Sequence, residues 1–404
     1  MKTILCQLAF SFAFLSLAGG ALAQGSLTPS GAPGATMKTL QQIEPRTAIS
    51  SLPFAITNAG SYYLTTNLTG AVGVTNGISI SAGDVTLDLM GFALIGGTGD
   101  GIRVSSFLTN IAIFNGTVRG WSGDGVDAFN ARNSQFERLR VSSNGGIGIS
   151  AGISCLVIDS TVNGNGPYGI YLDYSSMARN CSARSNVGDG IHATIGCTIS
   201  DCIANDNGVD GISASSGCTI SSCTMFNNGG DGIDASGSIT IRDCTAYANG
   251  IDGINVANGC TVSGSTASSN GSNGIVAGGG CTISGCTTAS NTGNGIQVAN
   301  DCRVLDNVCY SNGLGTGSGA GIHATISGNR IEANSVNDND RGIDVDGTSN
   351  LIIRNSAQAN PLNYDIVANN KVGVIVSAPF SGAVSGTIGG VGVGTTDPWA
   401  NFSF

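Results

Sequence analysis

The chain has 404 residues, with 16 Lys and Arg against 26 Asp and Glu, so its formal net charge is −10. This acidic balance excludes nucleic acids and anionic membrane surfaces as expected partners, because both require a basic protein face. Charged residues make up only 10% of the chain while 63 residues are Gly, a composition that suits a backbone with many tight turns.

The N-terminal residues predict export. Lys2 precedes the apolar run 4–17 and the small-residue sequence Ala21-Leu22-Ala23, which is typical of a signal peptide (residues 1–23) cut near Ala23. The mature protein is therefore expected to be secreted, periplasmic or on the cell surface, with a net charge of −11 after the loss of Lys2. The apolar run is too short to cross a bilayer and no later stretch is apolar enough, so no membrane span is expected.

Residues 24–48 are rich in Gly, Pro and Thr and lack periodicity, so we expect an extended lead there. Strand-like alternation starts at Ile49, and residues 49–76 are expected to cap the first coil of a repeat that fills residues 77–378. The six residues 314–319 interrupt the repeat and predict a flap, and the tail 379–404 is expected to cover the C-terminal end.

A period of 21 residues organises the repeat. Its anchors are eight isoleucines, at Ile149, Ile170, Ile191, Ile212, Ile233, Ile254, Ile275 and Ile296. After each anchor, inward Cys, Val or Ile residues alternate with Ser, Thr or Asp, which is the two-residue period of a strand. Coils of three short strands predict an all-β, single-domain parallel β-helix of about 13 coils.

A column of asparagines supports this prediction. Five residues before each anchor stand Asn144, Asn165, Asn186, Asn207, Asn228, Asn249, Asn270 and Asn291. An Asn amide both donates and accepts, so residues stacked at the ~4.8 Å strand spacing predict a hydrogen-bonded ladder. The ladder, the Gly-Ile turns and the small aliphatic columns resemble the right-handed parallel β-helices of the pectate-lyase-like superfamily over residues 78–366. That superfamily contains lyases, hydrolases, epimerases, tailspikes and non-catalytic proteins, so the resemblance implies the fold and leaves the activity open.

Twelve of the 13 cysteines lie outside the predicted signal peptide, and eleven of these fall in two inward columns. We expect a core of mostly free thiols, since side chains in one column run parallel and disulfide geometry is awkward there. If bridges form, the pairs within one coil are favoured: Cys197/Cys202, Cys218/Cys223 and Cys281/Cys286.

One place on the outward face of the first strand column carries a plausible acid–base set. Tyr171 and His192 stand on adjacent coils and are the candidate catalytic residues, because a His near neutral pKa beside a Tyr can move a proton α to a carboxyl group. The candidate substrate-binding residues are Tyr168, Asp173, Tyr174 and Asp234. The alternative is that His192 reflects repeat copying, since Gly-Ile-His-Ala-Thr-Ile occurs at residues 190–195 and again at 321–326.

A column of aspartates two residues before the anchors predicts a metal site. Its members are Asp189, Asp210, Asp231 and Asp252. Carboxylates on successive coils repel, and a bound Ca²⁺ would relieve that repulsion. The alternative is that Asp-Gly is a favourable turn pair and needs no ion. Asp231 with Asp234 also leaves paired-carboxylate hydrolysis open.

Two functions remain at this point. The first is an exported β-helix that binds extracellular polysaccharide or serves as a structural or surface module. The second is a calcium-aided polysaccharide lyase or related enzyme on an acidic glycan. The superfamily's Asp-Asp with Gly-His-Gly and its Asp-Pro-His motif are missing, although Tyr168-Gly169-Ile170 resembles the start of the epimerase motif. The sequence specifies no oligomeric state.

Overall fold

The computed structural model describes residues 45–404 except 72, 74, 314–318 and 378–395. The predicted signal peptide, most of the lead and most of the flap lie outside these residues. The chain divides after Pro45, and the described strands all belong to the unit Arg46–Phe404. In the described part of the chain, no helix is long and apolar enough to cross a membrane.

One coil shows how the sequence folds. Its three strands are β23 (Ile212–Ala214), β24 (Thr219–Ser221) and β25 (Thr224–Phe226). In β23, Ile212 and Ala214 are buried and Ser213 between them is partly exposed, as strand periodicity requires. The prediction of three short strands per coil is confirmed.

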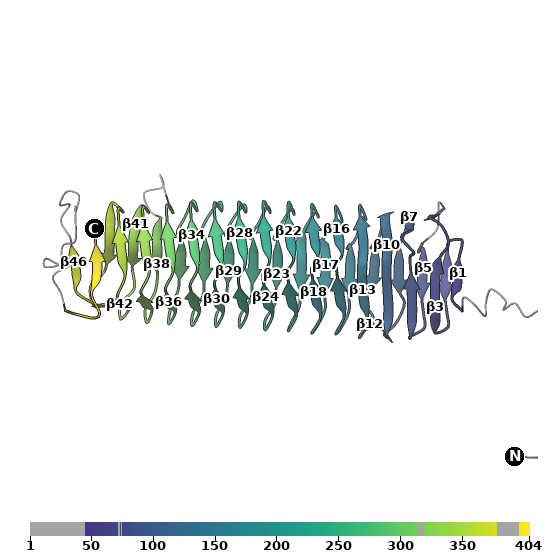
Figure 1. The fold of residues 1–404 in the computed structure, drawn as a ribbon, viewed down its shortest axis with the longest axis horizontal. Helices are drawn as coiled ribbons and strands as arrows, with labels where there is room; N and C mark the ends of the chain where they lie inside the picture. The colour runs from purple at the N-terminus through teal and green to yellow at the C-terminus, as the bar shows by residue number, and fades with distance from the viewer. Residues whose placement is uncertain (1–44, 72, 74, 314–318, 378–395) are drawn as a thin grey trace, which may run out of the picture. The chain divides into compact units, whose positions relative to one another are not determined.

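Successive coils stack into two long parallel sheets (Figure 1). Sheet B has 15 strands, one from each coil: β2 (Phe54–Ile56), β5 (Ile78–Ile80), β8 (Ile102–Val104), β11 (Val126–Ala128), β14 (Ile149–Ala151), β17 (Tyr168–Leu172), β20 (Asp189–Ala193), β23, β26 (Ile233–Ala235), β29 (Ile254–Val256), β32 (Ile275–Ala277), β35 (Ile296–Val298), β38 (Ala320–Ala324), β41 (Arg341–Val345) and β44 (Leu362–Ile366). Its anchors pair in register, for example Ile170 with Ile191 and Ile191 with Ile212.

Sheet A has 30 strands, which come from the other two sides of the coils: β1 (Thr47–Ile49), β3 (Gly60–Leu64), β4 (Leu68–Thr69), β6 (Val85–Asp88), β7 (Ala93–Gly97), β10 (Ile111–Trp121), β13 (Gln135–Ser142), β15 (Leu156–Ile158), β16 (Thr161–Asn163), β18 (Met177–Arg179), β19 (Ser182–Arg184), β21 (Thr198–Ser200), β22 (Ile203–Asn205), β24, β25, β27 (Thr240–Arg242), β28 (Thr245–Tyr247), β30 (Thr261–Ser263), β31 (Thr266–Ser268), β33 (Thr282–Ser284), β34 (Thr287–Ala289), β36 (Arg303–Leu305), β37 (Val308–Tyr310), β39 (Arg330–Glu332), β40 (Ser335–Asn337), β42 (Leu351–Ile353), β43 (Ser356–Gln358), β45 (Lys371–Val372), β46 (Ile375–Ser377) and β47 (Asn401–Ser403). A separate pair joins β9 (Leu108–Thr109) to β12 (Ala131–Arg132).

The number of coils is larger than the sequence predicts. Sheet B has 15 strands in the described residues, against an expectation of about 13 coils. One added coil begins with β2, which lies inside the segment expected to be a cap. Its residue Phe54 pairs with Ile78 on the next coil. At the other end the anchor is Tyr364, which pairs with Ile343, while Ile366 pairs with Val345. At both ends an aromatic residue occupies the anchor position where the repeat shows Ile.

The corners of each coil follow one local rule. A residue with a left-handed backbone comes immediately before an inward residue, as at Gly217 (φ 73°), Ser222 (φ 54°) and Asn227 (φ 56°) in the coil of β23. The inward residue then accepts a backbone N–H from the preceding coil: Cys218 Sγ from Cys197 at 3.3 Å and Asn228 Oδ1 from Asn207 at 3.1 Å. These side chains satisfy amide groups that a corner would otherwise leave unpaired.

The predicted asparagine ladder is present and is longer than expected. It continues from Asn144 through Asn291 to Asn312, Asn339 and Asn360. Asn207 shows how completely each amide is used. Its Nδ2 donates to Asn228 Oδ1 (3.0 Å) and Ala183 O (3.2 Å), and its Oδ1 accepts from the backbone N and the Nδ2 of Asn186. The ladder is therefore a buried polar network with its donors and acceptors matched.

Except for Cys309 in β37, the cysteines lie at the other two corners of the coils, in columns that also contain Ser and Asn. The twelve cysteines of the described residues are free and buried. One such column contains Ser176, Cys218 and Asn329. Each accepts the backbone N–H of the column member one coil earlier, at Oγ (2.9 Å), Sγ (3.3 Å) and Oδ1 (2.9 Å) respectively. The thiols of Cys218, Cys260, Cys281 and Cys302 thus act as corner acceptors as well as small core side chains, which the sequence analysis did not anticipate.

The Gly of each Gly-Ile step is required by close packing between coils. A Cβ at Gly211 would lie 2.6 Å from the carbonyl oxygen of Gly232 and 2.8 Å from Nδ2 of Asn228. Such distances are shorter than van der Waals contact, so a larger residue would push the corner away from its ladder partner.

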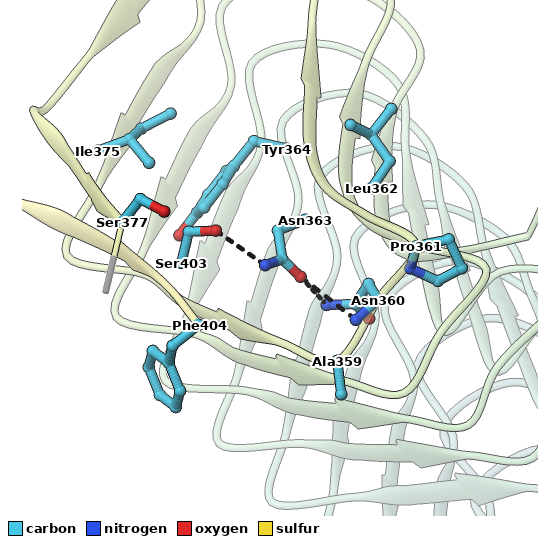
Figure 2. Close-up of a pocket in the computed structure, with 10 residues that line it drawn as sticks. All are labelled: Ala359, Asn360, Pro361, Leu362, Asn363, Tyr364, Ile375, Ser377, Ser403 and Phe404. Atoms are coloured by element: carbon cyan, nitrogen blue, oxygen red, sulfur yellow. Dashed lines mark hydrogen bonds between the residues drawn. The ribbon is translucent and has the colours of Figure 1, made fainter. Parts of the chain in front are cut away.

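The C-terminal end closes the ladder and leaves a hollow of about 530 Å³ (Figure 2). Asn363 Oδ1 accepts from Asn360 Nδ2 at 2.9 Å, and Asn363 Nδ2 donates to Ser403 Oγ at 2.8 Å. Ser403 belongs to β47, which pairs with β43 and β46. Residues 378–395 of the predicted tail lie outside the described part, and its role as a cover for this end stays a prediction.

We predict that Asn228→Ala destabilises the fold by roughly 3 kcal/mol or more, since it leaves buried donors of Asn207 without an acceptor. Urea unfolding followed by circular dichroism measures the effect. Asn227→Ser is the matched control, because Ser269 occupies the same left-handed column two coils later (φ 56°). Equal destabilisation by the two substitutions would contradict the role of the ladder.

Candidate functional site

The predicted catalytic residues lie side by side on the outward face of sheet B. Tyr171 in β17 pairs in register with His192 in β20, and Tyr168 pairs with Asp189. Tyr171 and His192 are each partly exposed, while their flanking residues Ile170, Leu172, Ile191 and Ala193 are fully buried. The strand period therefore projects both rings to the surface from a rigid base.

Three of the rings form an aromatic cluster on two adjacent coils, and a fourth reaches it from two coils earlier. The ring centroids of Tyr168 and His192 lie 4.5 Å apart, and those of Tyr171 and His192 lie 5.6 Å apart with an interplanar angle of 9°. Phe129 joins the cluster at 6.1 Å from Tyr171, and its side chain is exposed. The sequence analysis missed Phe129 because it follows β11 in a turn, outside the strand columns on which the prediction rests.

A carboxylate orients the His192 ring. Nδ1 of His192 lies 3.1 Å from Oδ2 of Asp189, whose side chain is largely buried. A carboxylate acceptor at Nδ1 favours the tautomer with its proton there, so the lone pair of the neutral ring is on Nε2. This arrangement suits His192 to accept a proton or a hydrogen bond from a ligand.

Tyr171 is suited to donate. Burial raises the pKa of Tyr171 above its ordinary value, and the nearby Asp173 raises it further. The phenol therefore remains protonated at neutral pH and acts as a hydrogen-bond or proton donor rather than as a base.

The other predicted substrate-binding residues differ in accessibility. Tyr174 is 49% exposed, whereas Asp173 is buried and accepts from Thr194 Oγ1 at 3.3 Å. Asp234 lies two coils beyond His192 in the same outward column, roughly 10 Å away at the strand spacing. Asn255 Nδ2 approaches Asp234 Oδ1 (3.5 Å) and Asp231 Oδ2 (3.3 Å), so Asp234 belongs to a separate polar group.

The aspartate column forms a second ladder. Each Oδ1 atom accepts the backbone N–H of the residue one coil later. The N···O distances are 3.3 Å for Asp189, 2.8 Å for Asp210, 2.8 Å for Asp231 and 2.7 Å for Asp252, whose donor is Asn273. Burial raises the pKa of Asp210 to about 6, and the charges of Asp189 and Asp231 add to the rise. One oxygen of each carboxylate thus has a structural partner, and the repulsion that motivates the calcium prediction is present.

The described residues contain one group of three metal-ligating side chains within 4.8 Å of one another, and it is His323, Asp344 and Asp346. It lies outside the predicted aspartate column. The calcium site at Asp189, Asp210, Asp231 and Asp252 stays a prediction.

Three hollows on the described surface are lined by residues other than the aromatic cluster. The largest is at the C-terminal end in Figure 2. Because Tyr168, Tyr171 and His192 stand on adjacent strands of sheet B with partly exposed side chains, we call the cluster a platform.

A family model described as a right-handed β-helix region matches residues 56–219 and, overlapping with it, 150–283, which together exceed half of the chain. The chain belongs to the right-handed β-helix family. No curated protein matches the sequence.

Several solved structures are similar to this β-helix. The A-module of the mannuronan C-5 epimerase AlgE6 of Azotobacter vinelandii is 17% identical over 78% of this chain and 89% of that one, with a TM-score of 0.40. The periplasmic alginate epimerase AlgG is 13% identical over 74% and 76%, with a TM-score of 0.35. A tailspike protein mutant of E. coli bacteriophage HK620, in complex with a pentasaccharide, is 15% identical over 79% and 65%, with a TM-score of 0.38. These similarities assign no activity to this β-helix.

We predict that Asp210→Asn stabilises the fold at neutral pH. Because the pKa of Asp210 in the fold (about 6) lies above its ordinary value of 3.8, ionisation destabilises the protein as the pH rises through that window. Asn keeps the oxygen that accepts the Asp231 N–H and removes the charge. The expected gain is about 1–2 kcal/mol, allowing for solvent screening of the partly exposed carboxyl.

Urea unfolding with a chelator present, at pH ~7.5 and ~4.5, checks this, since the gain should shrink at the lower pH. Asp243→Asn is the control, because Asp243 is an exposed corner residue and Asn180 already occupies that column. A gain that is the same at both pH values would contradict the assignment to Asp210.

Proposed function

We propose that this protein is an exported glycan-binding β-helix whose binding surface is the platform of Tyr168, Tyr171 and His192, with Phe129 at its edge. The observation that supports this proposal best is the stacking of rings from adjacent coils on the outward face of sheet B. Aromatic faces bind the apolar C–H faces of sugar rings, and tyrosine and histidine add hydrogen bonds to hydroxyl groups. Strands hold these rings in place, so little ordering is needed on binding.

The charges near the platform bear on the class of glycan. Asp189, Asp210, Asp231 and Asp234 lie along the C-terminal side of the platform, and the chain as a whole is acidic. A polyuronate would be repelled unless a cation bridges the two acidic partners. We therefore propose that the platform binds a neutral glycan in the absence of divalent ions. It binds an acidic glycan when Ca²⁺ occupies the aspartate column.

The location outside the cytoplasm is part of the same proposal. It is supported by the signal-peptide pattern of residues 1–23 with a cut near Ala23. These residues lie outside the described part of the chain.

A calcium-aided lyase or related activity is the second candidate, and the His192–Asp189 pair favours it. His192 is placed to accept a proton at Nε2, and Tyr171 is held protonated as a donor to a leaving oxygen. The outward column of sheet B offers one arginine among its described residues, Arg103. It is three coils before Tyr171 and is bound to Asp100 (3.1 Å) and Asp127 (3.7 Å). Neutralising a uronate carboxylate beside Tyr171 would therefore fall to Ca²⁺.

We predict that Tyr168→Ala weakens glycan binding about tenfold, the loss expected for one stacking ring. A glycan array followed by titration calorimetry on the best ligand, with and without Ca²⁺, measures it. Tyr247→Ala is the matched control, because Tyr247 is an exposed ring stacked on Phe226 (5.2 Å, 8°) in sheet A. Loss of binding in the control alone would move the glycan surface to sheet A, and binding to none of the glycans would remove the proposal.

We predict that any polysaccharide-cleaving activity is reduced at least a hundredfold by His192→Ala, because proton transfer contributes on the order of 10²–10⁴ to such rates. Ultraviolet absorbance of unsaturated products and an assay for new reducing ends report the reaction. Tyr171→Phe removes the phenol hydroxyl and keeps the ring, so it should reduce the rate while leaving glycan affinity within about threefold. Product formation unchanged by both substitutions would refute the assignment of this site as catalytic.

A further inference from the structure

The second histidine has surroundings unlike those of the first. His323 lies in the outward column of β38, in the second copy of Gly-Ile-His-Ala-Thr-Ile, and Asp344 in β41 is its register partner on the next coil. Its Nε2 is 2.9 Å from Oδ2 of Asp346. One ligand atom from each of His323, Asp344 and Asp346 lies within 4.8 Å of the other two.

We propose that His323, Asp344 and Asp346 form a binding site for a divalent transition-metal ion such as Zn²⁺. The site lies six coils beyond His192, roughly 29 Å away at the strand spacing, and is independent of the glycan platform. Imidazole together with two carboxylates suits zinc and neighbouring first-row ions, whereas calcium prefers sites made of oxygen alone.

The distances fit one ion after a small adjustment. Zinc bonds to nitrogen and oxygen of about 2.0–2.2 Å place tetrahedral ligand atoms roughly 3.4 Å apart. Asp344 is buried and therefore fixed, while the Asp346 side chain is 59% exposed and is able to move toward the ion. Three protein ligands leave a fourth position for water or for a group on a ligand.

Neighbouring polar groups hold two of the ligands in place. Arg341 Nη1 is 2.7 Å from Asp344 Oδ2, a contact that orients the carboxylate. His323 Nδ1 is 3.4 Å from Asn294 Nδ2, which donates to Gln297 Oε1 at 2.9 Å. Gln297 is the register partner of His323 on the preceding coil.

The local charge also favours a divalent cation. Arg341 faces Asp344 at 2.7 Å and Asp365 at 3.7 Å, and Asp346 lies beside His323. Three carboxylates against one guanidinium leave an excess of two negative charges when the imidazole is neutral. A bound Zn²⁺ neutralises that excess.

The first histidine provides an internal comparison. His192 stands in the same hexapeptide and also pairs with one carboxylate, Asp189. Its register partner on the following coil is Ser213, where His323 has Asp344. The hexapeptide alone is therefore not enough to form the site. The site also requires Asp344 and Asp346 of the next coil.

Titration calorimetry of the full metal-free chain with Zn²⁺, in a non-thiol reductant, tests the proposal, and the absorption spectrum of bound Co²⁺ reports its ligands. The expected result is one Zn²⁺ per chain, with affinity reduced at least tenfold by His323→Ala and by Asp346→Asn. His192→Ala should leave the Zn²⁺ affinity unchanged, and excess Ca²⁺ should not displace the ion.

Asp346→Asn alters an exposed side chain, so it keeps the test decisive if His323→Ala fails to fold. An absence of Zn²⁺ binding would overturn the proposal. Binding that survives both substitutions would place the metal at another site and would equally overturn it. A Co²⁺ spectrum dominated by thiolate charge transfer would place the metal at the cysteine columns, with the same consequence.

Discussion

The whole structure depends on hydrogen bonds from the corner backbone of one coil to an inward side chain of the next. A solenoid of short strands must turn three times per coil, and each turn leaves an N–H group inside the protein, where an unpaired donor costs about 1–3 kcal/mol. The ladders of Asn, Ser and Cys meet that requirement. The left-handed residue before each ladder member turns the backbone so that the side chain of the ladder member points inward. Strand pairing and core packing follow from this constraint, because the ladders set the register in which the isoleucine anchors stack.

The same constraint makes the outward face of sheet B suitable for a functional surface. Inward positions are committed to the core and the ladders, so outward positions vary with little consequence for the fold. Tyr171, His192 and His323 occupy equivalent positions on different coils, and their chemistry differs through the residues on adjacent coils. Asp189 reaches His192 from its own strand, whereas Asp344 and Asp346 reach His323 from the following coil.

The sequence predicts most of this fold because its columns record the inward and outward positions directly. The 21-residue spacing identified the coils from Ile149 to Ile296 and the Asn ladder along them. It missed the coil that begins with β2, where Phe54 occupies the anchor position in place of Ile. The site was predictable in part for the same reason. Tyr171 and His192 share a column, while Phe129 reaches them from a turn and Asp346 reaches His323 from just beyond its strand, where a column pattern carries no information about distance.

A further consequence concerns the length of the molecule. From Asn144 to Asn291 each ladder member is 21 residues from the next and makes equivalent contacts, so a coil gained or lost there would leave its neighbours with equivalent partners. Distances along this part of the β-helix therefore change by whole coils. A coil gained or lost between Asn228 and Asn291 would change the separation between the aromatic surface and the His323 group by roughly 4.8 Å, without altering either of them.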